Sequence, residues 1–229
     1  MSNSMIVQQP ASSARQLFLF FHGVGATPDS LVPAAQAIAS EFPLAMVVSV
    51  AAPFESDLGR GYQWFSVRGI TENNRISRIQ DAMPLFLQEV EHWQKISKLS
   101  YKETALIGFS QGAIMALQAS TAEPVVAARI VAHSGRYAVL PSTAQEQTTL
   151  HLIHGKNDEV IEYRHCIEAA HHLQTIGADF TADVIPFLTH SMSNESIALI
   201  IKNLKEHVPK YAWDTANQAA SDTAEVTGL

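Results

Sequence analysis

Cysteine is almost absent from this sequence. Cys166 is the only one in 229 residues, so no disulfide can form within the chain. Residues 1–15 also lack the basic, apolar and small-residue segments of a secretory signal. A reducing compartment suits both features, because disulfides persist mainly in oxidising ones. We therefore expect the protein to work in the cytoplasm, with Cys166 packed as a small hydrophobic side chain.

Long apolar runs and blocks of positive charge are missing as well. The longest strongly apolar run, Leu17 to Phe21, is far shorter than the roughly 20 residues that cross a bilayer. The chain has 15 basic and 22 acidic residues, and its net charge is −7. We expect no stable membrane insertion and no binding to nucleic acid, because phosphate backbones are bound by clustered basic side chains.

The composition does supply a buried core, since 47% of the residues are hydrophobic and 16% are charged. A chain of this length usually forms one domain. We expect a single domain over residues 1–211. Residues 212–229 are rich in small and polar types and show little apolar periodicity, which predicts a mobile tail.

Short apolar runs alternate with longer segments of helical periodicity, a pattern typical of a parallel sheet with helices on both faces. Six runs predict strands, at 17–21, 46–50, 104–108, 129–133, 150–154 and 180–185. The last run alternates between apolar and polar residues and predicts an edge strand, whereas the others are almost continuously apolar. One predicted helix begins after Thr27, with Pro28 at its first position. Four more cover about 72–97, 111–121, 164–176 and 193–207, and Pro84 is expected to kink or restart the helix at 72–97. The fold class is α/β, with a mostly parallel central sheet of about six or seven strands.

The segment Gly108-Phe109-Ser110-Gln111-Gly112 joins a predicted strand directly to a predicted helix. A G-x-S-x-G pattern in this context exposes a nucleophilic serine on a sharp turn. The glycines are needed because side chains two residues either side of the serine would meet neighbouring backbone. Ser110 is the candidate nucleophile.

A serine hydroxyl needs a base to accept its proton and an acid to orient that base. Asp158 follows the predicted strand at 150–154, and His190 follows the last predicted strand. Loops after parallel strands gather at one edge of a sheet, so both side chains should meet Ser110 there. Glu159 is an alternative acid, whereas Asp183 lies within the last strand and points away.

Acyl transfer also needs N–H donors for the oxyanion. We expect one from the backbone of Gln111, at the start of its helix, and one from Val24, in the glycine-containing loop after the first predicted strand. Trp64 and Phe65 lie in an aromatic segment that either packs in the core or walls a substrate pocket.

The ten histidines do not predict a metal site. His151 and His154, for example, lie on opposite faces of one strand and are expected to be surface or packing residues. His22 is expected to bond within the loop that carries Val24. His133-Ser134-Gly135 lacks the preceding glycine of a nucleophile turn and is expected to line the floor of the cleft.

Together these motifs resemble the phospholipase/carboxylesterase family of the α/β-hydrolase fold, which also contains acyl-protein thioesterases. The resemblance covers residues 17 to about 213, and it rests on residues 21–25, Gln63-Trp64-Phe65-Ser66, Gly69-Ile70-Thr71-Glu72, residues 106–113, and His154-Gly155 with Asp158. It implies a serine carboxylesterase that cleaves short to medium acyl esters or thioesters through Ser110, Asp158 and His190. It also implies oxyanion donors at Val24 and Gln111, and neither a metal nor a cofactor. Two positions depart from the family, Ser66 where an acid is usual and Thr189 where a glycine is usual.

The expected partner is a small ester that forms an acyl-enzyme intermediate on Ser110. Alternatives are a thioesterase or lysophospholipase of the same fold, a peptidase, or a hydrolase-like protein that binds without turnover, because a fold alone does not fix chemistry. The oligomeric state has no signal in the sequence.

Overall fold

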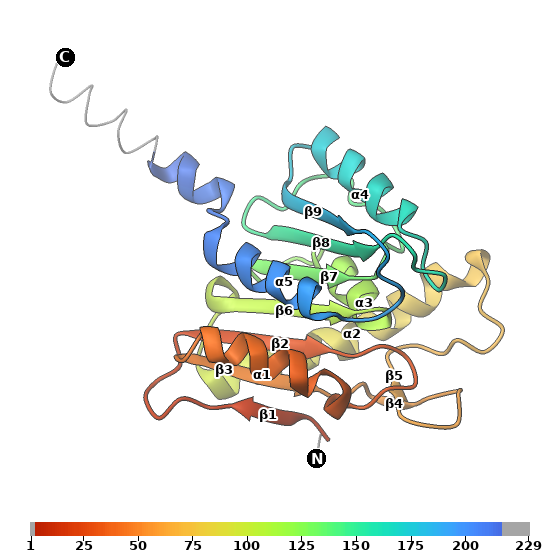
Figure 1. Ribbon diagram of the computed structural model, residues 1–229, viewed down its shortest axis with the longest axis horizontal. Helices are drawn as coiled ribbons and strands as arrows, with labels where there is room; N and C mark the ends of the chain where they lie inside the picture. The colour runs from red at the N-terminus through yellow and green to blue at the C-terminus, as the bar shows by residue number, and fades with distance from the viewer. Residues whose placement is uncertain (1–2, 217–229) are drawn as a thin grey trace, which may run out of the picture.

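A computed structural model describes residues 3–216 of the chain. Its centre is a seven-stranded sheet in the order β1-β3-β2-β6-β7-β8-β9 (Figure 1). The strands are β1 (Met5–Gln8), β2 (Gln16–Phe21), β3 (Ala45–Val50), β6 (Thr104–Phe109), β7 (Arg129–His133), β8 (Thr149–Gly155) and β9 (Asp179–Ile185). Only β1 pairs antiparallel in this sheet, and a separate short pair joins β4 (Phe54–Glu55) to β5 (Tyr62–Gln63).

All six predicted strands are present, and β9 lies at one edge of the sheet as expected. The other edge is β1, which the sequence analysis missed. Its four residues show no apolar alternation, and Met5 and Ile6 are exposed. Such a strand is stabilised by pairing with β3 rather than by its own pattern, so a local reading of the sequence could not find it.

Helices cover both faces of the sheet (Figure 1). They are α1 (Val32–Glu41), α2 (Glu72–Ser97), α3 (Gln111–Ala119), α4 (Arg164–Thr175) and α5 (Asn194–Glu206). Thr27 is the N-cap residue of a helical start at Pro28, although its side chain makes no capping hydrogen bond, and the first turn is a 3-10 turn, Pro28–Leu31, that leads into α1. Helix α2 continues through Pro84 without restarting.

The sheet separates two apolar layers. Successive residues of a strand point to opposite faces, so Leu17 and Leu19 of β2 pack with α2, α3 and α4, whereas Phe18 and Phe20 pack with α1 and α5. We call these the α2–α4 layer and the α1–α5 layer. Because both are filled with buried aliphatic and aromatic side chains, the strands between them are held at fixed depth, and so are the loops at their ends.

Residues 210–216 are helical, and the remainder of the predicted tail, 217–229, lies outside the described residues. Between residues 3 and 216, no helix has the length and apolar character needed to span a bilayer. The same part of the chain contains no group of three or more His, Cys, Asp or Glu side chains arranged to hold a metal ion.

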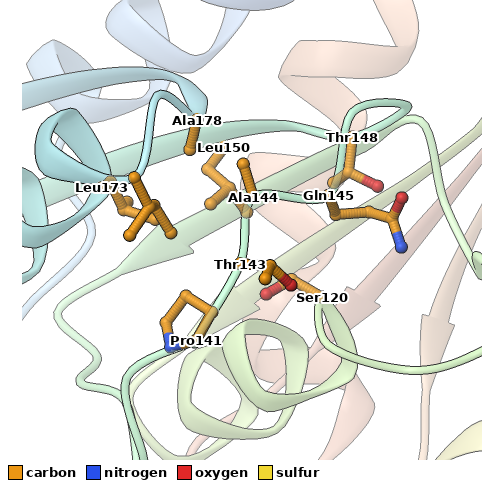
Figure 2. A pocket seen from close by; sticks show the side chains of 10 residues that line it. Ser120, Pro141, Thr143, Ala144, Gln145, Thr148, Leu150, Leu173 and Ala178 are labelled. Carbon is orange, nitrogen blue, oxygen red and sulfur yellow. The ribbon is translucent and has the colours of Figure 1, made fainter.

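A small cavity has a volume of about 10 Å³. Ser120, Thr148 and Ala178 are among the residues that line it (Figure 2). This volume suits one water molecule. Ser120 follows α3, and Thr148 and Ala178 precede β8 and β9, so the cavity lies at the amino ends of the strands. Ser110 follows the carboxyl end of β6, at the opposite edge of the sheet.

Candidate active site

Ser110 occupies a strained turn between β6 and α3, with φ 55° and ψ −116°. A Cβ at Gly112 would lie 2.0 Å from the carbonyl oxygen of Phe21, and one at Gly108 would lie 2.5 Å from the backbone of Ala113. Both approaches are far inside van der Waals contact, so only glycine fits at either position. The backbone therefore fixes the serine at the carboxyl edge of the sheet.

The structure brings Ser110, His190 and Asp158 together. His190 Nε2 is 2.8 Å from Ser110 Oγ, and His190 Nδ1 is 2.7 Å from Asp158 Oδ2. The other oxygen, Oδ1, accepts the N–H groups of Val160 and Ile161, each at 2.9 Å. Glu159, the alternative acid, is exposed.

The environment of Asp158 keeps it ionised. Burial opposes the charge, but hydrogen bonds from the Ile161 N–H and from His190 outweigh it and place the pKa of Asp158 below its usual value. An ionised carboxylate only accepts, so the proton on His190 lies on Nδ1. His190 Nε2 is then free to accept the hydroxyl proton of Ser110.

The loops that carry the acid and the base are bonded to each other. The N–H of Asn157 donates to Leu188 O and that of Lys156 donates to Ile185 O, both at 2.9 Å. The left-handed residue of the second loop is Phe187, with φ 62°, and Thr189 is not left-handed. The departure from the family at Thr189 is accommodated because the turn is made two residues earlier.

His154 is a contact of the acid that the sequence analysis missed. It is fully buried, which excludes the surface role considered for it. Its Nε2 lies 2.7 Å from Ile161 O and 3.3 Å from Asp158 Oδ2. Since the carbonyl only accepts, this nitrogen carries the proton and supports both the carboxylate and its loop. The sequence signals were the position of His154, four residues before Asp158, and its place in the His154-Gly155 motif of the family resemblance.

The loop with Val24 lies against the nucleophile, because a Cβ at Gly23 would be 3.1 Å from Ser110 Cβ. Neither the Val24 N–H nor the Gln111 N–H donates to any acceptor within residues 3–216. His22 bonds within this loop as expected. Its Nε2 accepts the Ala52 N–H at 3.2 Å, its Nδ1 lies 2.8 Å from Gly23 O, and burial lowers its pKa.

Trp64 and Phe65 are packed in the α2–α4 layer, with 1% and 4% of their surface exposed. The Trp64 ring lies edge-on to Phe21 and Phe86, at centroid distances of 5.5 and 5.2 Å. Of the two expectations for this segment, packing in the core describes the structure.

The residue after this pair, Ser66, is held by Asp57. The Ser66 hydroxyl donates to Asp57 Oδ2 at 2.6 Å, and the Val67 N–H donates to the same oxygen at 2.9 Å. The Ser66 bond is the main reason that the pKa of Asp57 falls to about 2. An acid is usual at position 66 in the family, and here Asp57 supplies a carboxylate to the same turn from another loop. No sequence motif surrounds Asp57.

His133 and Ser134 are not on the cleft floor, because both side chains are fully buried. The His133 ring lies 5.5 Å from that of Phe109, which lies 5.0 Å from that of His190. Neither ring nitrogen of His133 has a hydrogen-bond partner in the described part of the chain. Burial and the nearby histidines lower the pKa of His133 to about 4.

The burial of His133 predicts that the free energy of unfolding falls in acid, and that replacing His133 reduces this fall. In the unfolded chain a histidine binds a proton below about pH 6.5, whereas folded His133 stays neutral down to about pH 4. Stability is therefore lost as the pH falls through this window, at up to about 1.4 kcal/mol per pH unit. In His133→Leu, urea unfolding between pH 6.5 and 4.5 should show a slope shallower by about 1 kcal/mol per pH unit.

Leucine is close in volume and breaks no hydrogen bond at this position. The control is His171→Leu, which removes an exposed histidine from α4 and should keep the slope of the parent. An unchanged slope in His133→Leu would show that His133 is protonated alike in the folded and unfolded states.

Comparisons with known proteins show the family and the fold. The family model described as phospholipase/carboxylesterase matches residues 2–208. The chain is 46% identical to "Esterase YpfH" of Escherichia coli (strain K12) over 211 residues, which cover 92% of this chain and 91% of that protein.

Solved structures give the same fold. The crystal structure of esterase PE8 superposes with a TM-score of 0.79 at 25% identity, covering 90% of this chain and 98% of that one. The carboxylesterase from Mesorhizobium loti superposes with a TM-score of 0.74 at 20% identity, covering 90% of this chain and 100% of that one. Sequence similarity and sheet architecture therefore agree, and the chain belongs to the phospholipase/carboxylesterase family.

Proposed function

We propose that Ser110, His190 and Asp158 perform the ester hydrolysis of this family member on short to medium acyl esters. The observation that carries the proposal is the double contact of His190, at 2.8 Å to the hydroxyl and 2.7 Å to the carboxylate. These distances are those of a base that is hydrogen-bonded both to its nucleophile and to its orienting acid.

The chemistry follows from these positions. Ser110 Oγ attacks the ester carbonyl while its proton passes to His190 Nε2, and a tetrahedral oxyanion forms. The C–O bond to the alcohol then breaks, and His190 returns the proton to the departing oxygen. Water, deprotonated by the same nitrogen, attacks the acyl-Ser110 ester and releases the carboxylic acid. No metal or cofactor takes part in this scheme.

The N–H groups of Val24 and Gln111 are the proposed oxyanion donors. Gln111 follows Ser110 in the chain, Val24 follows Gly23, which packs against Ser110, and both N–H groups lack an acceptor within residues 3–216, which leaves them available for a substrate oxygen. The first residue of a helix has such a free N–H because no preceding turn supplies a carbonyl. Each donor of this kind is worth about 3 to 4 kcal/mol in a serine hydrolase of another fold.

A preference for soluble substrates rests on the loops of the carboxyl edge. Arg78 Nη1 donates to Ser66 O and Arg68 O, both at 2.8 Å, so the loop before α2 is tied to the body of the protein. Little of the chain is left to form a large lid, which favours small esters over aggregated lipid. Cytoplasmic action is part of the proposal, supported by the unpaired and buried Cys166.

Hydrolysis of p-nitrophenyl esters with acyl chains of increasing length tests the substrate class. We expect kcat/KM to be highest for short and medium chains and to fall for long ones, and we expect a fluorophosphonate probe to label Ser110. Intact activity after complete labelling, or labelling at another residue, would contradict the assignment. A thioester series run beside the esters separates esterase from thioesterase preference.

A further inference from the structure

The side chain of Gln111 bonds to the aromatic segment before α2. It is buried, with 3% of its surface exposed. Its Oε1 accepts the backbone N–H of Trp64 at 2.8 Å, and its Nε2 donates to the carbonyl of Phe65 at 2.7 Å. Both ends of the amide are therefore used on two consecutive residues of one segment, which fixes that segment against the first turn of α3.

Trp64 extends this connection to the loop that carries the other proposed donor. Its indole N–H donates to the carbonyl of His22 at 3.0 Å. His22 in turn bonds to Ala52 and Gly23, as described above. A continuous chain of buried hydrogen bonds thus runs from Gln111 through Trp64 to His22, two residues before Val24.

Simple packing does not require this arrangement. Trp93, in the same apolar layer, is also buried, yet its indole nitrogen has no partner among the described residues. Contact with substrate does not explain it either, because the exposed fraction of Trp64 is 1% and its ring is enclosed by Phe21, Phe86 and His22. The bond to His22 fixes the distance between two backbone segments.

We propose that Trp64, with the side chain of Gln111, is a positioning residue that sets the spacing of the two oxyanion donors. This inference rests on the proposed function. Displacing a donor weakens its bond to the transition state far more than to the ground-state carbonyl. Loss of the bridge should therefore lower kcat and leave KM nearly unchanged.

Trp64→Phe is the test, since it removes the indole N–H and retains an aromatic ring. A misplacement on the order of 1 Å costs about a hundredfold, and we expect kcat to fall by about 10- to 100-fold with KM within about twofold. The affinity for a boronic acid, whose serine adduct is tetrahedral and anionic, should fall in parallel with kcat/KM. Trp93→Phe is the matched control and should keep the kcat of the parent even where it lowers the melting temperature.

Gln111→Met provides a second variant, because it keeps the length of the side chain and removes both hydrogen bonds. The double variant with Trp64→Phe should lose little more than the poorer single variant, since both interrupt one chain of bonds. The inference is overturned if Trp64→Phe retains the kcat of Trp93→Phe, or if KM rises while kcat holds. Full activity in Ser110→Ala would defeat the proposed function itself, whereas an inactive Ser110→Ala beside a normal Trp64→Phe would defeat this inference alone.

Discussion

Ser110→Ala is expected to lower kcat for a p-nitrophenyl ester by about 10⁴- to 10⁶-fold, with the melting temperature almost unchanged. The loss is this large because, within residues 3–216, the hydrogen-bond partner of His190 Nε2 is Ser110 Oγ, at 2.8 Å, and no other hydroxyl or thiol bonds to that nitrogen. Alanine keeps the backbone of the turn and removes only the hydroxyl, so the fold should persist. Initial rates and a thermal melt on the purified variant measure both quantities.

Ser134→Ala is the matched control. Ser134 also follows a strand of the same sheet and also has a positive φ, 53°. Its hydroxyl is buried and has no partner within residues 3–216. The control should retain the kcat of the parent. Comparable activity in the two alanine variants would mean that Ser110 is not the nucleophile.

Asp158→Asn should lower kcat by about 10³- to 10⁴-fold, for a different reason. The Val160 and Ile161 N–H groups require an acceptor at Oδ1, so the amide of asparagine would turn its NH₂ toward His190 Nδ1. That nitrogen could then no longer carry the proton. The proton would move to Nε2, which could not accept a hydrogen from Ser110.

Glu159→Gln separates the two acids that the sequence left open. Glu159 is adjacent in the chain but exposed, so its activity should match that of the parent. If Glu159→Gln lost as much rate as Asp158→Asn, the assignment of Asp158 as the acid that orients His190 would be wrong. Both variants are measured at pH 7 to 8, where the wild-type Asp158 is ionised.

The parts of the site that could be predicted are those with a local pattern. Gly108 and Gly112 bracket Ser110 because the backbone there leaves no room for a Cβ, and this requirement is visible in five consecutive letters. Asp158 and His190 could be placed because each follows a predicted strand of a parallel sheet, whose carboxyl ends meet at one edge. Chain order and strand position were sufficient for these residues.

The parts that could not be predicted depend on contacts between distant segments. The bond between Asp57 and Ser66 and that between Gln111 and Trp64 join loops whose geometry no short motif describes. Burial was likewise hidden at His133 and His154, since a histidine in an apolar strand suits either a surface or an interior position. The edge strand β1 was missed because its pairing, rather than its composition, makes it a strand.

The two apolar layers of the fold divide the support of the catalytic residues between them. Trp64 and Ala113, which brace the nucleophile turn, belong to the α2–α4 layer. Phe109, whose ring lies 5.0 Å from that of His190, packs on the α1–α5 layer, as do Leu188 and Met192, which lie two residues before and after His190 in the chain. Because residues of both layers hold the serine and the base, we expect that loosening either layer separates His190 from Ser110, and that activity on heating is lost before the sheet unfolds.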